Sequence, residues 1–442
     1  MQPVAILPAE EYAVRRRTLL ERLGADAVAL VPAAGETLRN RDTHHPFRQD
    51  SDFQYLTGFP EPDALAVLAP GAEAEYELFV RERNPEMETW NGRRAGPEGA
   101  VARYGAGRAH TLAALDERLP ELLANRKRIY YALGRNPEFD RRVLGWLERV
   151  RARSRQGVRA PVELCELGTL LHELRLFKRP AEVELLRRAA TITAEGHCRA
   201  MQACRPGLYE YQLEAELLYT FTRSGAGWAY PSIVGGGDNA TILHYVENNA
   251  PLRDGELVLI DAGCEVDGYC ADITRTFPVN GRFSGEQRAL YEVVLAAQHA
   301  ALAEVRPGRP WQAFHDAAVK VLSEGLVELG ILQGDPAERI ADESYRRFYM
   351  HRTGHWLGLD VHDVGDYRDP DGQWRALQPG MVLTVEPGLY IASGNQGVDE
   401  RWWGLGIRIE DDVLVTADGH EILTAGVPKA VDDIEALMRA AR

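Results

Sequence analysis

Four acidic residues in the C-terminal half of the chain follow or interrupt apolar, strand-like runs: Asp261, Asp272, Glu386 and Glu410. Carboxylates at the ends of apolar strands are expected to be partly buried, and four that converge would repel one another strongly. Divalent cations relieve such repulsion, because each carries two positive charges and prefers oxygen ligands. The four acids therefore predict a metal site.

A segment between the two pairs of acids offers imidazole ligands, at His351, His355 and His362. The spacing of His351 and His355 would place both on one face of a helix. Gly354 and Gly358 disfavour a continuous helix there, so a helical zinc pair is not predicted. Four carboxylates with one imidazole favour manganese or cobalt, with zinc possible, over a structural tetrahedral zinc.

The N-terminal third has the mixed periodicity of an α/β domain. Short apolar runs predict strands at 27–31 and 64–68, and amphipathic runs predict helices at 10–23 and 112–124. A leucine-rich stretch around 161–178 predicts a further helix. Arg179-Pro180 is expected to end this helix, and Pro180 can serve as the first residue of the next helix. A domain boundary is placed near 176, which gives domains 1–176 and 177–442.

The C-terminal part positions the acids on hairpins. Helices are predicted at 181–204, 209–224, 284–304 and 311–330, and strands at 256–263, 269–279, 381–390, 404–415 and 420–423. One acid-bearing hairpin turns at Val266-Asp-Gly and carries Asp261 and Asp272; another carries Glu386 and Glu410. The likeness of the two hairpins indicates an internal duplication around a shared cleft. The predicted fold class is α/β (α+β).

Composition excludes several classes of partner. The 442 residues carry a formal net charge of −15, which argues against nucleic acid and against an anionic membrane surface. The N-terminus lacks the basic region of a secretory signal, and no window approaches the length of apolar chain that a membrane span needs. Five cysteines without C-x-x-C spacing are typical of reduced thiols, so a cytoplasmic location is expected.

Several motifs resemble one known family. The segments His351–Asp363, Glu386-Pro-Gly-Leu-Tyr and Gly406-Ile-Arg-Ile-Glu-Asp, together with Asp261-Ala-Gly and Asp272-Ile-Thr-Arg, look like the signatures of the pita-bread metallopeptidases. Within that group the chain is similar to the Xaa-Pro aminopeptidases (aminopeptidase P), because its N-terminal segments at 51–59 and 88–94 also look like theirs. The resemblance implies an N-terminal α/β domain before a pita-bread catalytic domain with pseudo-twofold hairpins.

The same resemblance implies roles for individual residues. Two divalent metals, most favourably manganese, would be held by Asp261, Asp272, His355, Glu386 and Glu410, with Asp272 and Glu410 as bridges. Glu386 would also move a proton. The implied substrate-contacting and supporting residues are His244 near the substrate, His351 at the proline pocket, His362 on the scissile carbonyl and Arg408 behind the carboxylates.

The implied reaction is hydrolysis of the N-terminal Xaa-Pro bond of a peptide by a hydroxide between two metals. A prolidase that cleaves only Xaa-Pro dipeptides is the nearest alternative, and a non-catalytic binding protein of the same fold is a distant one. Trp356 is a candidate for the wall of the proline pocket or a core residue. The family tends to form dimers or tetramers, so Trp90 either reaches a neighbouring subunit's cleft or packs on its own surface.

Overall fold

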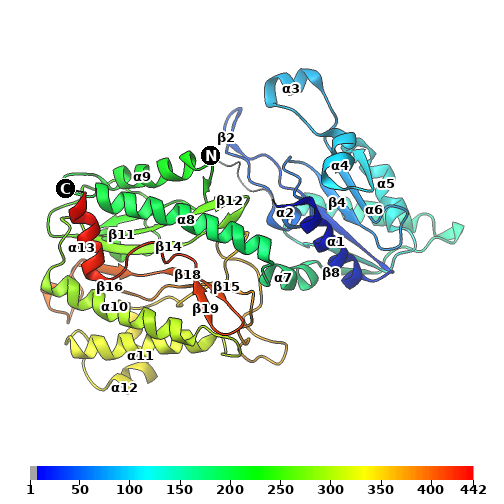
Figure 1. Cartoon of the computed structure of the whole chain (residues 1–442). Helices are drawn as coiled ribbons and strands as arrows, with labels where there is room; N and C mark the ends of the chain where they lie inside the picture. Colours follow the sequence, from blue (N-terminus) through cyan, green and yellow to red (C-terminus); the bar gives the residue numbers. More distant parts are fainter. Residues whose placement is uncertain (1–6, 442) are drawn as a thin grey trace. The chain divides into compact units, whose positions relative to one another are not determined.

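The computed structural model describes residues 7–441, which form two compact units divided between Arg175 and Leu176 (Figure 1). The first unit is a mixed α/β layer, and the second holds the predicted site. No helix within 7–441 has both the length and the apolar character that crossing a membrane requires.

The N-terminal unit is built on one six-stranded sheet with the order β6-β5-β4-β1-β7-β8. Its strands are β1 (Ala27–Pro32), β4 (Leu65–Leu68), β5 (Tyr76–Val80), β6 (Arg108–Thr111), β7 (Arg128–Tyr131) and β8 (Glu163–Glu166). The central β1 pairs antiparallel with β4 and parallel with β7. The predicted strands at 27–31 and 64–68 are therefore confirmed as the middle of the sheet. A small separate hairpin joins β2 (Leu38–Asn40) to β3 (Thr43–His44).

Helices of this unit connect the strands and cover the sheet: α1 (Ala9–Leu23), α2 (Ser51–Thr57), α3 (Pro85–Asn91), α4 (Gly96–Tyr104), α5 (Leu115–Leu123), α6 (Pro137–Arg151) and α7 (Gly168–Leu176). Helix α6 starts where Asn136 accepts hydrogen bonds from two backbone amides and Pro137 sets the first helical φ angle. Its fully buried Trp146 and Val143 pack with Leu119 of α5 in the core of the unit.

The predicted helix around 161–178 is partly wrong. Residues Glu163–Glu166 form edge strand β8, which pairs parallel with β7, and only Gly168–Leu176 are helical. The leucines at 167 and 171 gave a helical period that extended too far towards the N-terminus. Tertiary pairing with β7 decided the conformation of the first four residues.

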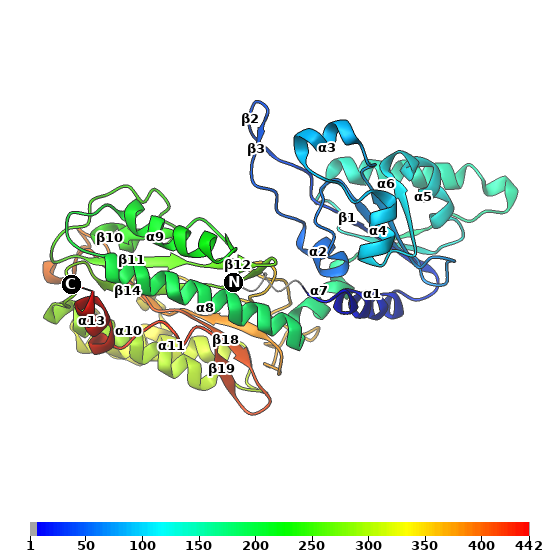
Figure 2. The same cartoon turned by 45° about the horizontal axis from the view of Figure 1, so that its top comes forward.

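The C-terminal unit contains helices α8 (Pro180–Ala203), α9 (Glu210–Arg223), α10 (Gly285–Glu304), α11 (Gln312–Glu328), α12 (Pro336–Ala341) and α13 (Val431–Ala440). The predicted helices at 181–204, 209–224, 284–304 and 311–330 are confirmed. Helix α10 begins with a capping box, in which Ser284 Oγ accepts from the amide of Gln287 and the Gln287 side chain accepts from the amide of Ser284. Helices α8 and α9 lie on one side of the strands and α10 and α11 on the other (Figures 1 and 2).

The first acid-bearing hairpin consists of two ladders. Strand β11 (Leu257–Ala262) pairs with β14 (Ile273–Pro278) and with β10 (Ile233–Gly236), and the tip of the hairpin pairs β12 (Cys264–Val266) with β13 (Tyr269–Cys270) and β9 (Gly227–Trp228). The ladders part at Gly263, where a Cβ atom would lie 1.7 Å from the carbonyl oxygen of Ala271. Only glycine permits this approach, which leaves Asp272 in the gap before β14.

The second acid-bearing hairpin is broken in the same manner. Strand β15 (Val382–Val385) pairs with β18 (Asp411–Val415), which also pairs with β19 (His420–Ile422), while β16 (Gly388–Ile391) pairs with β17 (Leu405–Arg408). The predicted strands at 381–390 and 404–415 are thus each two strands. Glu386 and Glu410 occupy the two breaks, which lie opposite one another across the hairpin. Short 3₁₀ turns occur at Leu112–Ala114, Ser154–Gln156, Gly237–Thr241, Ser344–Arg347 and Glu400–Trp402.

Candidate metal centre

The two hairpins bring their four acids to one cavity of about 740 Å³, which His355 also lines. Asp261 is in β11 opposite Thr274, and Asp272 is in the gap before β14. Each hairpin therefore supplies two carboxylates at the point where its ladder is interrupted. The structure gathers all five predicted ligands: Asp261, Asp272, His355, Glu386 and Glu410.

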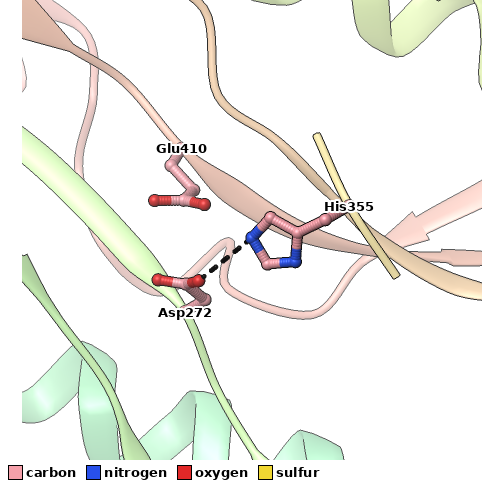
Figure 3. A group of neighbouring side chains, drawn as sticks. All are labelled: Asp272, His355 and Glu410. Carbon is pink, nitrogen blue, oxygen red and sulfur yellow. Dashed lines mark ion pairs between the residues drawn. The ribbon is translucent and has the colours of Figure 1, made fainter. Parts of the chain in front are cut away.

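The tightest group within this set is Asp272, His355 and Glu410, whose candidate ligand atoms all lie within 4.8 Å of one another (Figure 3). The Nε2 atom of His355 is 3.4 Å from Asp272 Oδ2 and 3.6 Å from Glu386 Oε1. The imidazole thus faces carboxylates from both hairpins. Its other ring nitrogen, Nδ1, lies 3.0 Å from the carbonyl oxygen of Trp356. That contact fixes which nitrogen is free to bind a cation.

His355 reaches this place on an extended segment rather than on a helix, as the glycines predicted. The segment lies against β15: the amide of His355 donates to Thr384 Oγ1, and its carbonyl oxygen accepts from the amide of Thr384. A Cβ atom at Gly354 would lie 2.0 Å from the carbonyl oxygen of Thr384. Glycine is therefore required for the close approach that carries His355 to the carboxylates.

Two side chains, the partly buried Tyr230 and the buried Arg408, hold the aspartates in place. The Tyr230 hydroxyl lies between Asp261 Oδ1, at 2.7 Å, and Asp272 Oδ1. Arg408 donates through Nη2 to Asp261 Oδ2 at 2.6 Å and through Nε to Thr274 Oγ1 at 3.0 Å. The Thr274 hydroxyl in turn donates to Glu410 Oε2 at 2.7 Å. One connected set of hydrogen bonds therefore fixes the spacing of carboxylates from both hairpins.

The four carboxylates of the cluster carry more formal negative charge than the neighbouring cationic side chains can neutralise. Burial, followed by repulsion from neighbouring carboxylates, raises the pKa of Glu410 well above its ordinary value. Burial also raises the pKa of Asp261 and brings that of Glu386 to about 7. Burial opposes ionisation of Asp272 as well, but the hydrogen bond from His355 and its charge lower the pKa of that carboxyl. Arg408 and His355 are the cations in contact with the cluster, so the donor set suits further positive charge from divalent ions.

The His351 side chain lies beside the carboxylates and joins the same network of hydrogen bonds through Tyr390. Its Nε2 is 2.8 Å from the Tyr390 hydroxyl, which also accepts from Arg408 Nη1 at 3.0 Å. Its Nδ1 is 3.7 Å from Glu386 Oε2. Burial, and then the charge of Arg408, lowers the pKa of His351 to about 3, so the ring is neutral at physiological pH. A neutral imidazole here offers a flat, weakly polar wall.

The remaining predicted residues divide between the cavity and elsewhere. His244, His362 and Arg408 line the cavity together with the carboxylates, and burial, followed by the charge of His355, lowers the pKa of His362. Trp356 is fully buried in the hydrophobic core and is not among the cavity-lining residues, which favours its reading as core. Trp90 belongs to α3 of the N-terminal unit, where its side chain is 81% exposed.

Sequence reasoning missed several residues of the site. Tyr390 and Thr274 lie inside the motifs that were singled out, four and two residues after an acidic ligand candidate, but their spacing alone assigns no partner. Tyr230 lies in a loop that carries no motif. Arg352, Arg368 and Trp374 also line the cavity. Only the folding of these segments against the hairpins identifies them.

Comparison with known proteins places the chain among metallopeptidases. The family model described as metallopeptidase family M24 matches residues 184–417, and the model described as the N-terminal domain of aminopeptidase P matches residues 12–130. The chain is 47% identical to the Xaa-Pro aminopeptidase of Escherichia coli (strain K12) over 98% of each chain.

Solved structures agree over nearly the whole length. The structure of Pseudomonas aeruginosa aminopeptidase PepP is 56% identical and has a TM-score of 0.97, with 98% of this chain and 99% of that chain covered. Zinc-substituted Escherichia coli aminopeptidase P in complex with product has a TM-score of 0.96 at 47% identity, covering 99% of this chain and 100% of the other. Both units of the chain therefore have counterparts in these proteins.

Proposed function

The chain belongs to metallopeptidase family M24, and we propose that it is an Xaa-Pro aminopeptidase, which releases the first amino acid from peptides that have proline in second place. The observation that carries the proposal is the convergence of four acids and one histidine on a single cavity. Relatives that match both units are Xaa-Pro aminopeptidases and support the same activity.

We propose that two divalent cations bind between the hairpins. Asp261 would hold one, His355 and Glu386 the other, and Asp272 and Glu410 would bridge them. The excess of carboxylate oxygen and the single imidazole fit manganese best, with cobalt or zinc possible. The M24 family membership and a zinc-substituted relative support dependence on a metal. When bound, such cations lower the pKa of a shared water and supply hydroxide at neutral pH.

The residues of the chain divide the remaining work. Glu386, at the edge of the cluster and 3.7 Å from His351 Nδ1, accepts the proton of the attacking water and returns it to the leaving nitrogen. His362 lines the cavity and is itself exposed, and it donates a hydrogen bond to the scissile carbonyl oxygen as negative charge develops on that oxygen. His244 lines the same cavity and contacts the substrate. Arg408 keeps Asp261 and Tyr390 in register.

The specificity for proline is assigned to His351. The nitrogen of an Xaa-Pro amide carries no N–H, so an enzyme cannot recognise this bond through that donor. A pocket that contacts the pyrrolidine ring itself solves the problem. The neutral His351 ring, held by Tyr390 and stacked edge-on against Tyr349 at 4.8 Å, offers such a wall.

The finer cellular features are proposals as well. The five cysteines are free thiols, which supports a cytoplasmic location. Trp90 exposes a large aromatic surface on α3, and we assign it to contact with a second copy in a dimer or tetramer. Neither nucleic acid nor membrane is proposed as a partner.

The decisive experiment is a peptide panel assayed with manganese, cobalt and zinc in turn. Cleavage of Xaa-Pro-peptides between the first two residues is expected, with slower cleavage of Gly-Pro. Rapid cleavage of the dipeptide alone would identify a prolidase instead. Absence of cleavage, combined with absence of stoichiometric metal by mass spectrometry, would indicate a binding protein that has lost catalysis.

A further inference from the structure

Two arginines line the candidate catalytic cavity together with the carboxylates: Arg352 and Arg368. Among residues 7–441, neither has a carboxylate partner within ion-pair distance. Among the described residues, other exposed arginines of this unit, such as Arg306, also lack a carboxylate partner, so these two differ by their place in the wall of the cavity. Their place beside the site therefore invites a ligand that carries negative charge.

A tryptophan holds both arginines in position. The Arg368 guanidinium lies 3.9 Å from the centre of the Trp374 ring, and that of Arg352 lies 5.5 Å from it. Arg368 and Trp374 face each other across a short hairpin, joined by a β-bridge. Stacking of this kind fixes a guanidinium plane while its N–H groups remain able to donate. We call these three residues the arginine–tryptophan rim.

Each guanidinium donates one hydrogen bond to the protein and has further N–H groups that can donate to a ligand. Arg352 donates through Nη1 to Gln312 Oε1 at 3.1 Å, and Arg368 donates through Nη1 to the carbonyl oxygen of Gly372 at 2.6 Å. Guanidinium has five N–H donors, so both arginines keep donors for a ligand. Asp366 lines the same cavity and opposes an anion. It neutralises at most one of the two charges, so the rim stays cationic.

The position of the rim relative to the substrate follows from His351. If His351 contacts the proline ring, the next residue of the chain, Arg352, lies beside the path that the peptide takes after proline. The peptide's N-terminus is held at the metal centre, so its remaining length must leave the cavity past this region. The rim therefore meets the residue that follows proline.

We propose that the arginine–tryptophan rim binds a carboxylate on the residue after proline, and so favours peptides of the form Xaa-Pro-acid. The inference rests on the proposed function and deepens it. The carboxylate has two sources: the side chain of a glutamate or aspartate, or the free C-terminus of a tripeptide. Arginine binds either through paired, charge-assisted hydrogen bonds.

Four substrates separate these sources. Ala-Pro-Glu-amide and Ala-Pro-Gln-amide differ only in the side-chain charge, and Ala-Pro-Ala differs from Ala-Pro-Ala-amide only in the terminal charge. The manganese-loaded enzyme should cleave each charged member of a pair with a higher kcat/KM than its neutral partner. We expect roughly threefold to tenfold, mainly through KM, as is typical of a partly solvated charge pair. The larger of the two ratios identifies the source.

Variants assign the preference to the rim. Arg352→Gln and Arg368→Gln should each lower the charged-to-neutral ratio towards one. Trp374→Leu should lower it too, although it removes no charge, because Arg368 loses its platform. Arg306→Gln serves as the matched control: it removes the same charge from an exposed side chain of this unit that does not line the cavity, and it should keep the wild-type ratio.

The outcomes discriminate cleanly. A ratio near one in the wild type overturns the proposal. So does a ratio that falls equally in Arg306→Gln, because general attraction of anions would then explain it, or a ratio that Trp374→Leu leaves unchanged. Failure of the proposed function has a different signature, since none of the four peptides would then be cleaved after alanine.

Discussion

Glu410 and Asp411 are consecutive, both buried, and in opposite electrostatic environments. Glu410 faces the candidate metal centre, where its carboxylate accepts a hydrogen bond from Thr274, and burial together with the neighbouring carboxylates raises its pKa. Asp411 begins β18, and its carboxylate accepts from four groups: Arg275, Thr424, Gln298 and Lys429. Burial by itself would raise the pKa of Asp411. The charges of Arg275 and Lys429 outweigh burial and lower that pKa to about 2.

The contrast separates carboxylates that hold the fold from carboxylates that hold a ligand. The cluster around Asp411 is complete, because its hydrogen bonds and its charge are satisfied by the chain itself. The cluster around Glu410 is not complete, since its negative charge exceeds the positive charge supplied by Arg408 and His355. Buried charge without internal compensation costs stability and persists where function requires it. The first cluster should therefore respond to mutation in stability, and the second in activity and metal binding.

The largest effect should come from Asp272→Ala. Loss of the carboxylate that is proposed to bridge the metals is expected to reduce kcat/KM on an Xaa-Pro-peptide by roughly 10³-fold or more at saturating manganese, because both cations would lose a shared ligand. In the presence of a chelator, the unfolding midpoint should not fall, because the substitution relieves repulsion. Near wild-type turnover would contradict the assignment of Asp272, and circular dichroism checks that the variant is folded.

Asp411→Asn tests the complete cluster. It leaves the buried Arg275 and the Lys429 ammonium without their carboxylate, so the free energy of unfolding should fall by about 3 kcal/mol. Urea denaturation followed by fluorescence measures the loss. Asp433→Asn, an exposed position in the same unit, is the matched control and should change stability by less than about 0.5 kcal/mol. Equal stability of the two variants would remove the distinction between the clusters.

Binding of manganese should stabilise the folded protein through the cluster around Glu410 and not through the cluster around Asp411. At a manganese concentration of about 100 times Kd, binding to the folded state raises the free energy of unfolding by about 2.7 kcal/mol. In Asp411→Asn, manganese should raise the free energy of unfolding by the same amount as in the wild type, although the metal-free variant is less stable. In Asp272→Ala, most of this stabilisation by manganese should be lost. Differential scanning fluorimetry with and without chelator reports both, and an equal shift in both variants would contradict the assignment.

A compensated carboxylate in the other unit extends the comparison to pH. Burial opposes ionisation of Asp52, but His172, whose Nε2 lies 3.5 Å from Asp52 Oδ2, and the charge of Arg175 lower the pKa of Asp52 to about 2. A depressed carboxyl pKa stabilises the fold above the unfolded value near 4, and that stability is lost as pH falls towards 2. The contribution is about 2 kcal/mol. Urea denaturation measures the difference in free energy of unfolding between wild type and Asp52→Asn. This difference should shrink as the pH falls from about 4 towards 2. A difference that stays constant would refute the stabilising role of the ionised Asp52.

The sequence by itself indicated that the four acids form a metal site, because several carboxylates buried close together repel one another unless they share a cation. The choice of His355 among three nearby histidines came from the resemblance to a known family. The sequence also determined most element positions, since the periodicity of α8 to α11 and of the strands is local. It overextended the helix before Leu176, because pairing of Glu163–Glu166 with β7 is not a local property.

Only the tertiary structure decided how the site is completed. The Tyr230 hydroxyl contacts Asp261 and Asp272, which are 31 and 42 residues away in the sequence. Arg408, on the other hairpin, donates a hydrogen bond to Asp261. Trp356 became core and Arg352 became cavity wall, although they are four residues apart. Contacts between distant segments depend on which faces pack together, and that is set by the whole fold rather than by any one pattern of residues.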